Sequence, residues 1–110
     1  MKLAAIDIGS NAIRLQIVRV YDDGNLISFK KLEFLRFPLR LGHDVFTQGE
    51  ISGTVAEKFV KLMLTFKLFI ELYEVDGYVA VATSAMREAA NAKDIGKRIL
   101  NETGLKIEII

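Results

Sequence analysis

Residues 4–18 read AAIDIGSNAIRLQIV, and this stretch decides the topology expected at the start of the chain. Residues 3–8 and 12–21 are rich in apolar and β-branched side chains, which favour strands. The short Gly-Ser-Asn connection between them is typical of a hairpin turn, in which Gly9 or Asn11 is expected to take a positive φ. The sequence therefore predicts that the chain opens with an antiparallel hairpin.

A second turn signal follows at residues 22–25, because the Asp-Gly pair and Asn tolerate the left-handed backbone of tight hairpins. Residues 26–37 then have the composition of a third, long strand, and Pro38 ends it or marks a sheet edge. The glycine-containing stretch over residues 38–52 is expected to be a connecting loop. Three antiparallel strands followed by a loop thus make up the predicted first half.

Helical periodicity begins near residue 52 and continues to residue 73, with apolar side chains recurring at three- and four-residue steps. Either Ser52 as an N-cap or a capping box that begins at Thr54 marks its start. Residues 78–82, YVAVA, are a continuous apolar run of the kind that fills a buried parallel strand. We therefore expect a helix that crosses over to a parallel strand.

The last part of the chain repeats this helix–strand pattern. Residues 83–90 are expected to be a loop or a short helix. Asn91 is expected to cap a helix over residues 92–103, which Gly104 ends in a left-handed conformation, and residues 105–110 read as a strand. The order β-β-β-α-β-α-β predicts an α/β fold of ribonuclease-H-like topology, with a five-stranded mixed sheet and helices on its faces.

Composition sets limits on the class of protein. The chain has 110 residues, a formal net charge of +1, 51% hydrophobic residues and no cysteine, which is the profile of one globular domain in a reducing cytoplasm. Its charges form no basic stripe for duplex nucleic acid. The N-terminus reads as a strand rather than a signal peptide, and charges interrupt the apolar segment 55–73, so we expect no membrane span.

Asp7 is the residue that most needs explanation, because it stands in an otherwise apolar strand. By strand alternation it shares a face with Leu3 and Ala5, so its carboxylate is expected to be shielded and to require a partner. In one interpretation it accepts hydrogen bonds from the turn amides. In the other, the amides of residues 9–11 bind phosphate oxygens and Asp7 holds a hydrated divalent cation.

The run from Ala4 to Leu15 resembles the first phosphate loop of the exopolyphosphatase and guanosine pentaphosphate phosphohydrolase (Ppx/GppA) family, a branch of the actin, Hsp70 and sugar-kinase superfamily. Three further stretches resemble the family in the same order: residues 39–42 (Leu-Arg-Leu-Gly), residues 81–89 (Val-Ala-Thr-Ser-Ala-Met-Arg-Glu-Ala) and residues 104–110. Ala12 stands where relatives often have Ser or Thr, which removes one hydroxyl donor.

The resemblance implies a magnesium-dependent hydrolase that releases terminal phosphate from inorganic polyphosphate or from guanosine pentaphosphate. Asp7 would then help to organise the Mg²⁺ ion, through water. The phosphate-binding residues that the resemblance implies are Gly9, Ser10, Asn11, Arg14 and Arg87. A planar guanidinium at the end of the fourth strand suits a polyanion, and ligands gather at the carboxyl ends of strands in open α/β sheets.

Each arginine also has a structural alternative. Arg14 is equally well placed as a surface residue of its strand. Arg87 has acidic neighbours in Glu88 and Asp94, with which it can form an ion pair. The two interpretations differ in whether the guanidinium is available to a ligand.

The polar residues around the other motifs carry weaker signals. Thr83 and Ser84 are expected to cap the following helix rather than to donate to phosphate. Arg40 either reaches the site or fixes its own loop. His43 has no second His or Cys at ligand spacing and is expected to be a plain loop residue.

The family's Ser-Gly-x-Glu-Glu-Ala motif and its second phosphate loop follow the last strand in relatives, and neither occurs in residues 1–110. We therefore expect this stretch to be the N-terminal lobe of a two-lobed phosphatase, with no catalytic residue of its own and no activity alone, paired with the missing lobe or with a second copy. The alternatives are a non-catalytic phosphate- or nucleotide-binding or partner-dependent module, and a sugar-kinase-like ATPase lobe, which fits the segment ATSAMREA less well.

Overall fold

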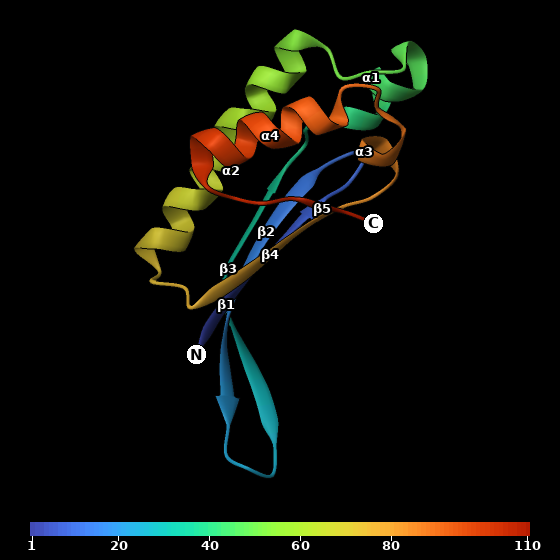
Figure 1. Cartoon of the computed structure of the whole chain (residues 1–110). Helices are drawn as coiled ribbons and strands as arrows, with labels where there is room; N and C mark the ends of the chain where they lie inside the picture. The colour runs from blue at the N-terminus through green and yellow to red at the C-terminus, as the bar shows by residue number, and fades with distance from the viewer.

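The computed structural model describes residues 1–110 and contains a five-stranded sheet with four helices (Figure 1). In chain order the elements are β1 (Lys2–Ile8), β2 (Ile13–Asp22), β3 (Ile27–Phe37), α1 (Leu41–Gln48), α2 (Gly53–Leu72), β4 (Gly77–Ala82), α3 (Ser84–Glu88), α4 (Ala92–Thr103) and β5 (Glu108–Ile109). The strand order is β3-β2-β1-β4-β5, with β1 antiparallel to β2 and parallel to β4. This is the mixed sheet and the ribonuclease-H-like α/β class that the sequence predicts.

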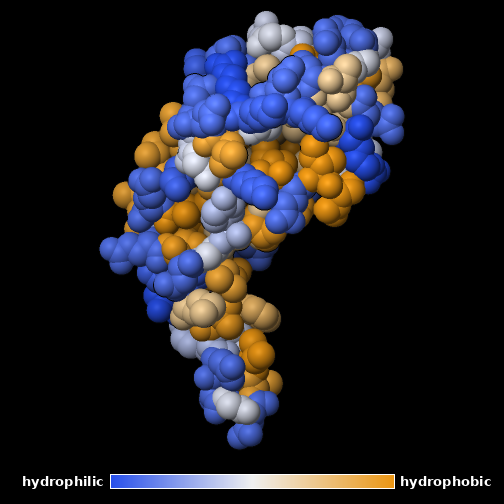
Figure 2. All heavy atoms as spheres, in the orientation of Figure 1, coloured by the Kyte–Doolittle hydropathy of each residue, from blue (hydrophilic) through white to orange (hydrophobic).

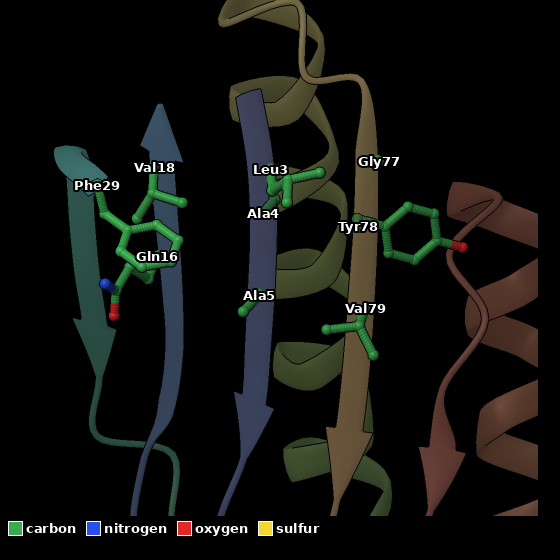
Figure 3. A pocket seen from close by; sticks show the side chains of 9 residues that line it. All are labelled: Leu3, Ala4, Ala5, Gln16, Val18, Phe29, Gly77, Tyr78 and Val79. Carbon is green, nitrogen blue, oxygen red and sulfur yellow. The ribbon is translucent and has the colours of Figure 1, made fainter. Parts of the chain in front are cut away.

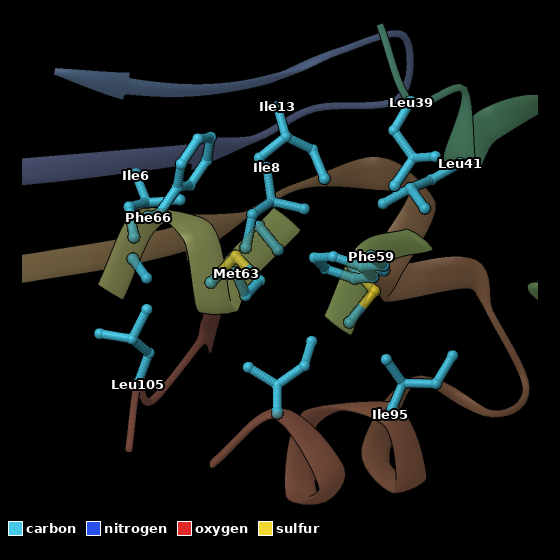
Figure 4. Packing of buried hydrophobic residues seen from close by; sticks show 14 of the residues in the cluster. Ile6, Ile8, Ile13, Leu39, Leu41, Phe59, Met63, Phe66, Ile95 and Leu105 are labelled. Atoms are coloured by element: carbon cyan, nitrogen blue, oxygen red, sulfur yellow. The ribbon is translucent and has the colours of Figure 1, made fainter. Parts of the chain in front are cut away.

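One face of the sheet carries the core. Side chains alternate along β1, so that Ala4, Ile6 and Ile8 are buried on this face. The helices α2 and α4 pack over it (Figure 4). Their contribution consists of Phe59, Val60, Met63, Phe66, Ile70, Ile95 and Ile99, all buried. The hydrophobic effect of this single cluster holds the helices to the sheet.

The opposite face of the sheet is open, although helices were expected on both. Figure 3 shows this face with the helices behind the strands. A shallow hollow on it is lined by Leu3, Ala4, Ala5, Gln16, Val18, Phe29, Gly77, Tyr78 and Val79. Val79 is 43% exposed, so the apolar run of β4 is buried on one side only. The sequence of β4 is nevertheless typical of a strand covered on both faces.

The β2–β3 hairpin extends well beyond the rest of the sheet (Figure 1). Gly24 has a φ of 90° at its tip, and the Asp23 carboxylate accepts hydrogen bonds from the Asn25 and Leu26 amides, as the turn signal predicts. The register shifts between Ile17 and Val18, which marks a bulge in the long ribbon. Apolar surface runs along one side of the projecting hairpin (Figure 2).

The predicted loop over residues 38–52 was wrong in its middle part, because Leu41–Gln48 forms α1. Leu41 and Val45, one turn apart, are buried, and Gly49 ends the helix in the left-handed conformation. Gly42 and Gly49, which are poor helix formers, made the helical period of this short segment hard to recognise in the sequence. The predicted helix that follows is confirmed, and of its two predicted starts the structure has Ser52 as the N-cap, whose hydroxyl accepts a hydrogen bond from the Val55 amide.

Two further expectations differ from the structure. Neither Gly9 nor Asn11 has a positive φ, so the first turn closes without a left-handed residue. The last strand is Glu108–Ile109 only, because the Lys106 amide donates to the Tyr78 hydroxyl instead of to a neighbouring strand. None of the helices is both long and apolar enough to cross a membrane.

Candidate phosphate-binding site

The candidate site forms where β1 and β4 end. These strands are parallel neighbours, with Ile8 opposite Ala82, so the segments that follow them leave the sheet at the same edge. The Thr83 amide donates to the Ile8 carbonyl at 3.4 Å and ties the two exits together. Motifs about seventy residues apart in sequence thus meet where α/β sheets bind ligands.

The turn over residues 9–12 has a specific hydrogen-bonding pattern. The Gly9 amide donates to the Ala12 carbonyl at 3.1 Å, and a Cβ on Gly9 would lie 3.1 Å from that same oxygen. The Gly9 amide is therefore used within the turn. The amides of Ser10 and Asn11 donate no hydrogen bond within the chain, so these two remain available to an anion.

Ser10 is held from two sides. Its carbonyl accepts a hydrogen bond from the Gly42 amide at 2.8 Å, and its Oγ lies 3.1 Å from the Oγ of Ser84. A Cβ on Gly42 would lie only 2.8 Å from the Ser10 Cβ, so only glycine allows this approach. The Arg-Leu-Gly and Thr-Ser-Ala segments therefore both contact the turn through Ser10.

Asp7 lies on the open face and is not shielded, contrary to expectation. Its side chain is 54% exposed, because no element covers that side of the sheet. Nor does it accept hydrogen bonds from the turn amides. Its Oδ2 contacts Nη1 of Arg14 at 3.3 Å, across a directly paired position of β1 and β2. The carboxylate thus keeps acceptor positions that no protein group fills.

A row of charged side chains extends this pair across the sheet. In the strand register Arg14 lies opposite Arg36 of β3 as well as opposite Asp7. Arg36 is exposed and was missed from the sequence, since only the pairing of β2 with β3 places it beside the turn. Two guanidinium groups therefore share the open face with Asp7 at the end of the sheet from which the turn leaves, and an anion bound there would gain from both.

Arg87 has a partner that neither interpretation named. Its Nη1 donates to the carbonyl oxygen of Ile110 at 2.7 Å, and it forms no ion pair with Glu88 or Asp94. The guanidinium is exposed at the end of α3. The structure thus connects Arg87 to the end of β5 rather than to the turn.

The capping expectations at the other polar residues were wrong. The Thr83 side chain forms no capping hydrogen bond, and the Ser84 hydroxyl contacts Ser10 instead. Asn91 precedes α4 as expected, but its side chain binds the backbone of Ile51 and does not cap the helix. The contact of Ser84 with Ser10 follows from strand order, because β4, the strand that precedes Ser84, is the parallel neighbour of β1.

The remaining candidates lie apart from this cluster. Arg40 precedes α1 and is exposed, with no side-chain hydrogen bond. His43 is an exposed residue of α1, and no group of three or more His, Cys, Asp or Glu side chains forms a metal cluster in the chain. Any cation at Asp7 would have this one carboxylate as its acidic ligand.

Comparison with known proteins identifies the family. The Ppx/GppA phosphatase family matches residues 17–110. The bifunctional 3-dehydroquinate synthase/phosphatase of Fusobacterium nucleatum is 32% identical over 110 residues, which cover 97% of this chain and 17% of that protein. Exopolyphosphatase 1 of Mycobacterium leprae is 29% identical over 100% of this chain and 32% of its own. Both alignments extend through the turn over residues 9–12.

Solved structures agree. The Aquifex aeolicus member of the Ppx/GppA family superposes with a TM-score of 0.91 at 32% identity, covering 100% of this chain and 35% of that one. The RuvC structure of Thermus thermophilus, at a TM-score of 0.57 and 16% identity, shares the fold alone. The chain thus spans about a third of the length of the exopolyphosphatase and Aquifex relatives it matches. On both sequence and structure, the chain belongs to the Ppx/GppA phosphatase family.

Proposed function

We propose that this chain is the N-terminal phosphate-binding lobe of a magnesium-dependent phosphohydrolase that removes terminal phosphate from inorganic polyphosphate or guanosine pentaphosphate. The observation that carries the proposal is the pair of unused amides at Ser10 and Asn11, in the turn that joins the strands of the half-exposed Asp7 and its partner Arg14. Backbone amides and a guanidinium are the donors that phosphate oxygens bind best. In a relative named exopolyphosphatase, the region that aligns with this chain is about a third of a larger protein.

The donor set of Asp7 fits magnesium bound through water. Mg²⁺ retains several of its waters and needs only one or two carboxylates together with substrate phosphates. Asp7 supplies one such carboxylate, whose only side-chain partner is Arg14 at 3.3 Å. When bound, the ion would neutralise phosphate charge. The chain's own contribution is to hold the phosphate with the amides of residues 10–11 and to place Arg14 beside it.

Hydrolysis needs more than this cluster supplies. Phosphoryl transfer requires an oriented water, a base and charge stabilisation on both sides of the phosphate. The turn and Arg14 provide donors on one side. We therefore propose that residues 1–110 bind phosphate but do not hydrolyse it alone, and that the base and the second phosphate loop belong to the rest of a longer protein.

A partner-dependent binding module is the second candidate, and the open sheet face favours it over a self-contained one. An apolar face that stays exposed is typical of a surface that another segment covers. The two candidates share the turn and differ in whether a complementary lobe restores hydrolysis.

The test is a titration of the ¹⁵N-labelled chain with inorganic tripolyphosphate in the presence of Mg²⁺, followed by amide chemical shifts. We expect the largest shifts at Ser10 and Asn11, and affinity at least about tenfold weaker in Asp7→Asn and Arg14→Ala. Glu50→Gln, which neutralises an exposed carboxylate outside the turn, is the matched control. Absence of shifts at residues 9–11 would contradict the proposal. Release of phosphate by the chain alone, lost in Asp7→Ala, would contradict its inactivity.

A further inference from the structure

We propose that Ser84 is a positioning residue of the phosphate turn: its hydroxyl donates to Ser10 Oγ, so that the Ser10 proton points at a phosphate oxygen. This inference rests on the proposed function. It gives Ser84 a part that is neither helix capping nor direct contact with phosphate.

The starting observation is the 3.1 Å separation of the two Oγ atoms, in which either hydroxyl can donate. A serine hydroxyl has one proton and two acceptor lone pairs. If Ser10 donates to Ser84, it has no proton left for a ligand. If Ser84 donates to Ser10, the Ser10 proton is free. A phosphate group at the turn, which only accepts, therefore selects the second arrangement.

The backbone on both sides of this contact is fixed. The Ser10 carbonyl is bound by the Gly42 amide at 2.8 Å. Ser84 begins α3, whose Ala85 and Met86 are 2% and 1% exposed, so their packing anchors this short helix. Neither serine can move away without breaking these contacts. The Ser84 hydroxyl is thus held within hydrogen-bond distance of Ser10 before a ligand arrives, so its position is preorganised and only its proton has to reorient.

A hydrogen bond from Ser84 to Ser10 also strengthens the hydrogen bond that Ser10 donates to phosphate. In a chain of two hydroxyls each bond polarises the next, so a donor to Ser10 Oγ makes the Ser10 proton a better donor. The effect of Ser84 on phosphate affinity therefore passes through the Ser10 hydroxyl and disappears when that hydroxyl is removed. This dependence separates positioning from an independent contact.

The experiment is a double-mutant cycle on tripolyphosphate affinity in the presence of Mg²⁺, with Ser84→Ala, Ser10→Ala and the double variant. We expect Ser84→Ala to weaken binding by about fivefold in the wild-type background and by less than about 1.5-fold in the Ser10→Ala background. Ser84→Thr keeps the hydroxyl and is expected to restore affinity. Thermal unfolding of each variant checks that the fold is intact.

The outcomes separate the inference from the function on which it rests. Unchanged affinity in Ser84→Ala, together with weakened binding in Ser10→Ala and Asp7→Asn, would overturn the inference and leave the phosphate site. An equal loss from Ser84→Ala in both backgrounds would make Ser84 an independent contact and overturn positioning. A wild-type chain that does not bind tripolyphosphate would refute the phosphate site, and the role of Ser84 with it.

Discussion

The side-chain amide of Asn91 forms hydrogen bonds with both polar backbone groups of Ile51, the N–H and the carbonyl. Its Oδ1 accepts from the Ile51 amide at 3.0 Å and its Nδ2 donates to the Ile51 carbonyl at 2.8 Å. The Ala90 amide adds a hydrogen bond to the Gly49 carbonyl at 2.9 Å. The start of α4 is thereby attached to the segment between α1 and α2.

We expect Asn91→Ala to lower the free energy of unfolding by about 2 kcal/mol, because two backbone groups of Ile51 lose their partner. Ile51 is 2% exposed, so water does not readily replace the amide. Asn91→Asp keeps the acceptor and loses the donor, so its free energy of unfolding is expected to lie between those of wild type and Asn91→Ala. Urea unfolding measures both. A stability of Asn91→Ala equal to wild type would show that the contact is dispensable.

Acid should weaken the fold partly through Asp44. The hydrogen bond from the Ser52 amide, at 3.0 Å, holds the pKa of Asp44 below its usual range. The stabilisation from its ionised form is full above the unfolded value of about 3.9 and is lost as pH falls through the lower folded value. We expect Asp44→Asn to be less stable at neutral pH and less sensitive to acid below pH 4. Thermal melts of both proteins across this pH range measure the difference.

Two glycine-to-alanine substitutions should act in opposite directions. At Gly42 a Cβ would lie 2.8 Å from the Ser10 Cβ, so Gly42→Ala is expected to cost about 1–3 kcal/mol and to weaken tripolyphosphate binding. At Gly96, within α4, nothing lies within 4 Å of a Cβ, so Gly96→Ala should stabilise by about 0.5–1 kcal/mol. Urea unfolding measures the change in stability, and the tripolyphosphate titration measures the change in affinity. Similar effects at the two sites would argue against the close approach at Ser10.

The Asp7–Arg14 pair should contribute to binding and little to stability. Both side chains are about half exposed, so the ion pair is worth about 0.5 kcal/mol or less. We expect Arg14→Ala to leave thermal unfolding within the error of the measurement while weakening tripolyphosphate binding, most strongly at low salt. A large loss of stability would indicate that Arg14 is a structural residue of β2.

The open face should bind apolar probes. Leu3 and Val79 line its hollow and are 36% and 43% exposed. We expect Leu3→Thr with Val79→Thr to reduce the fluorescence of a hydrophobic dye without lowering stability by more than about 1 kcal/mol. Ile6→Thr, on the core face of the same strand, should destabilise severely. Dye fluorescence unchanged by the double substitution would place the exposed apolar surface elsewhere.

Much of the fold could be predicted from local signals. Alternation over β1 and β2, the turn at Gly24 and the period of α2 each depend on near neighbours in sequence, and all are confirmed. The helix α1 was missed because its apolar positions are few, Gly42 lies within it and Gly49 follows it. The last strand was predicted too long, because the Tyr78 hydroxyl takes the amide of Lys106, a contact between distant residues.

The candidate site could be predicted in part. Its residues in the turn were found from their types and order, whereas the exposure of Asp7 was not. Alternation tells which residues share a face but not which face is covered. Arg36, and the contact of Ser84 with Ser10, entered only with strand order, which places distant segments side by side.

The projecting hairpin offers a practical consequence. Its tip at Gly24 and Asn25 lies at the far end of β2 from the phosphate turn, a separation of about 30 Å along a ten-residue strand. A fluorophore or surface linker attached at Asn25 would therefore report on, or immobilise, the molecule without touching the turn. A long two-stranded ribbon bends more easily than a sheet. A probe at Asn25 would therefore also respond to a molecule that binds beside the hairpin and changes its position.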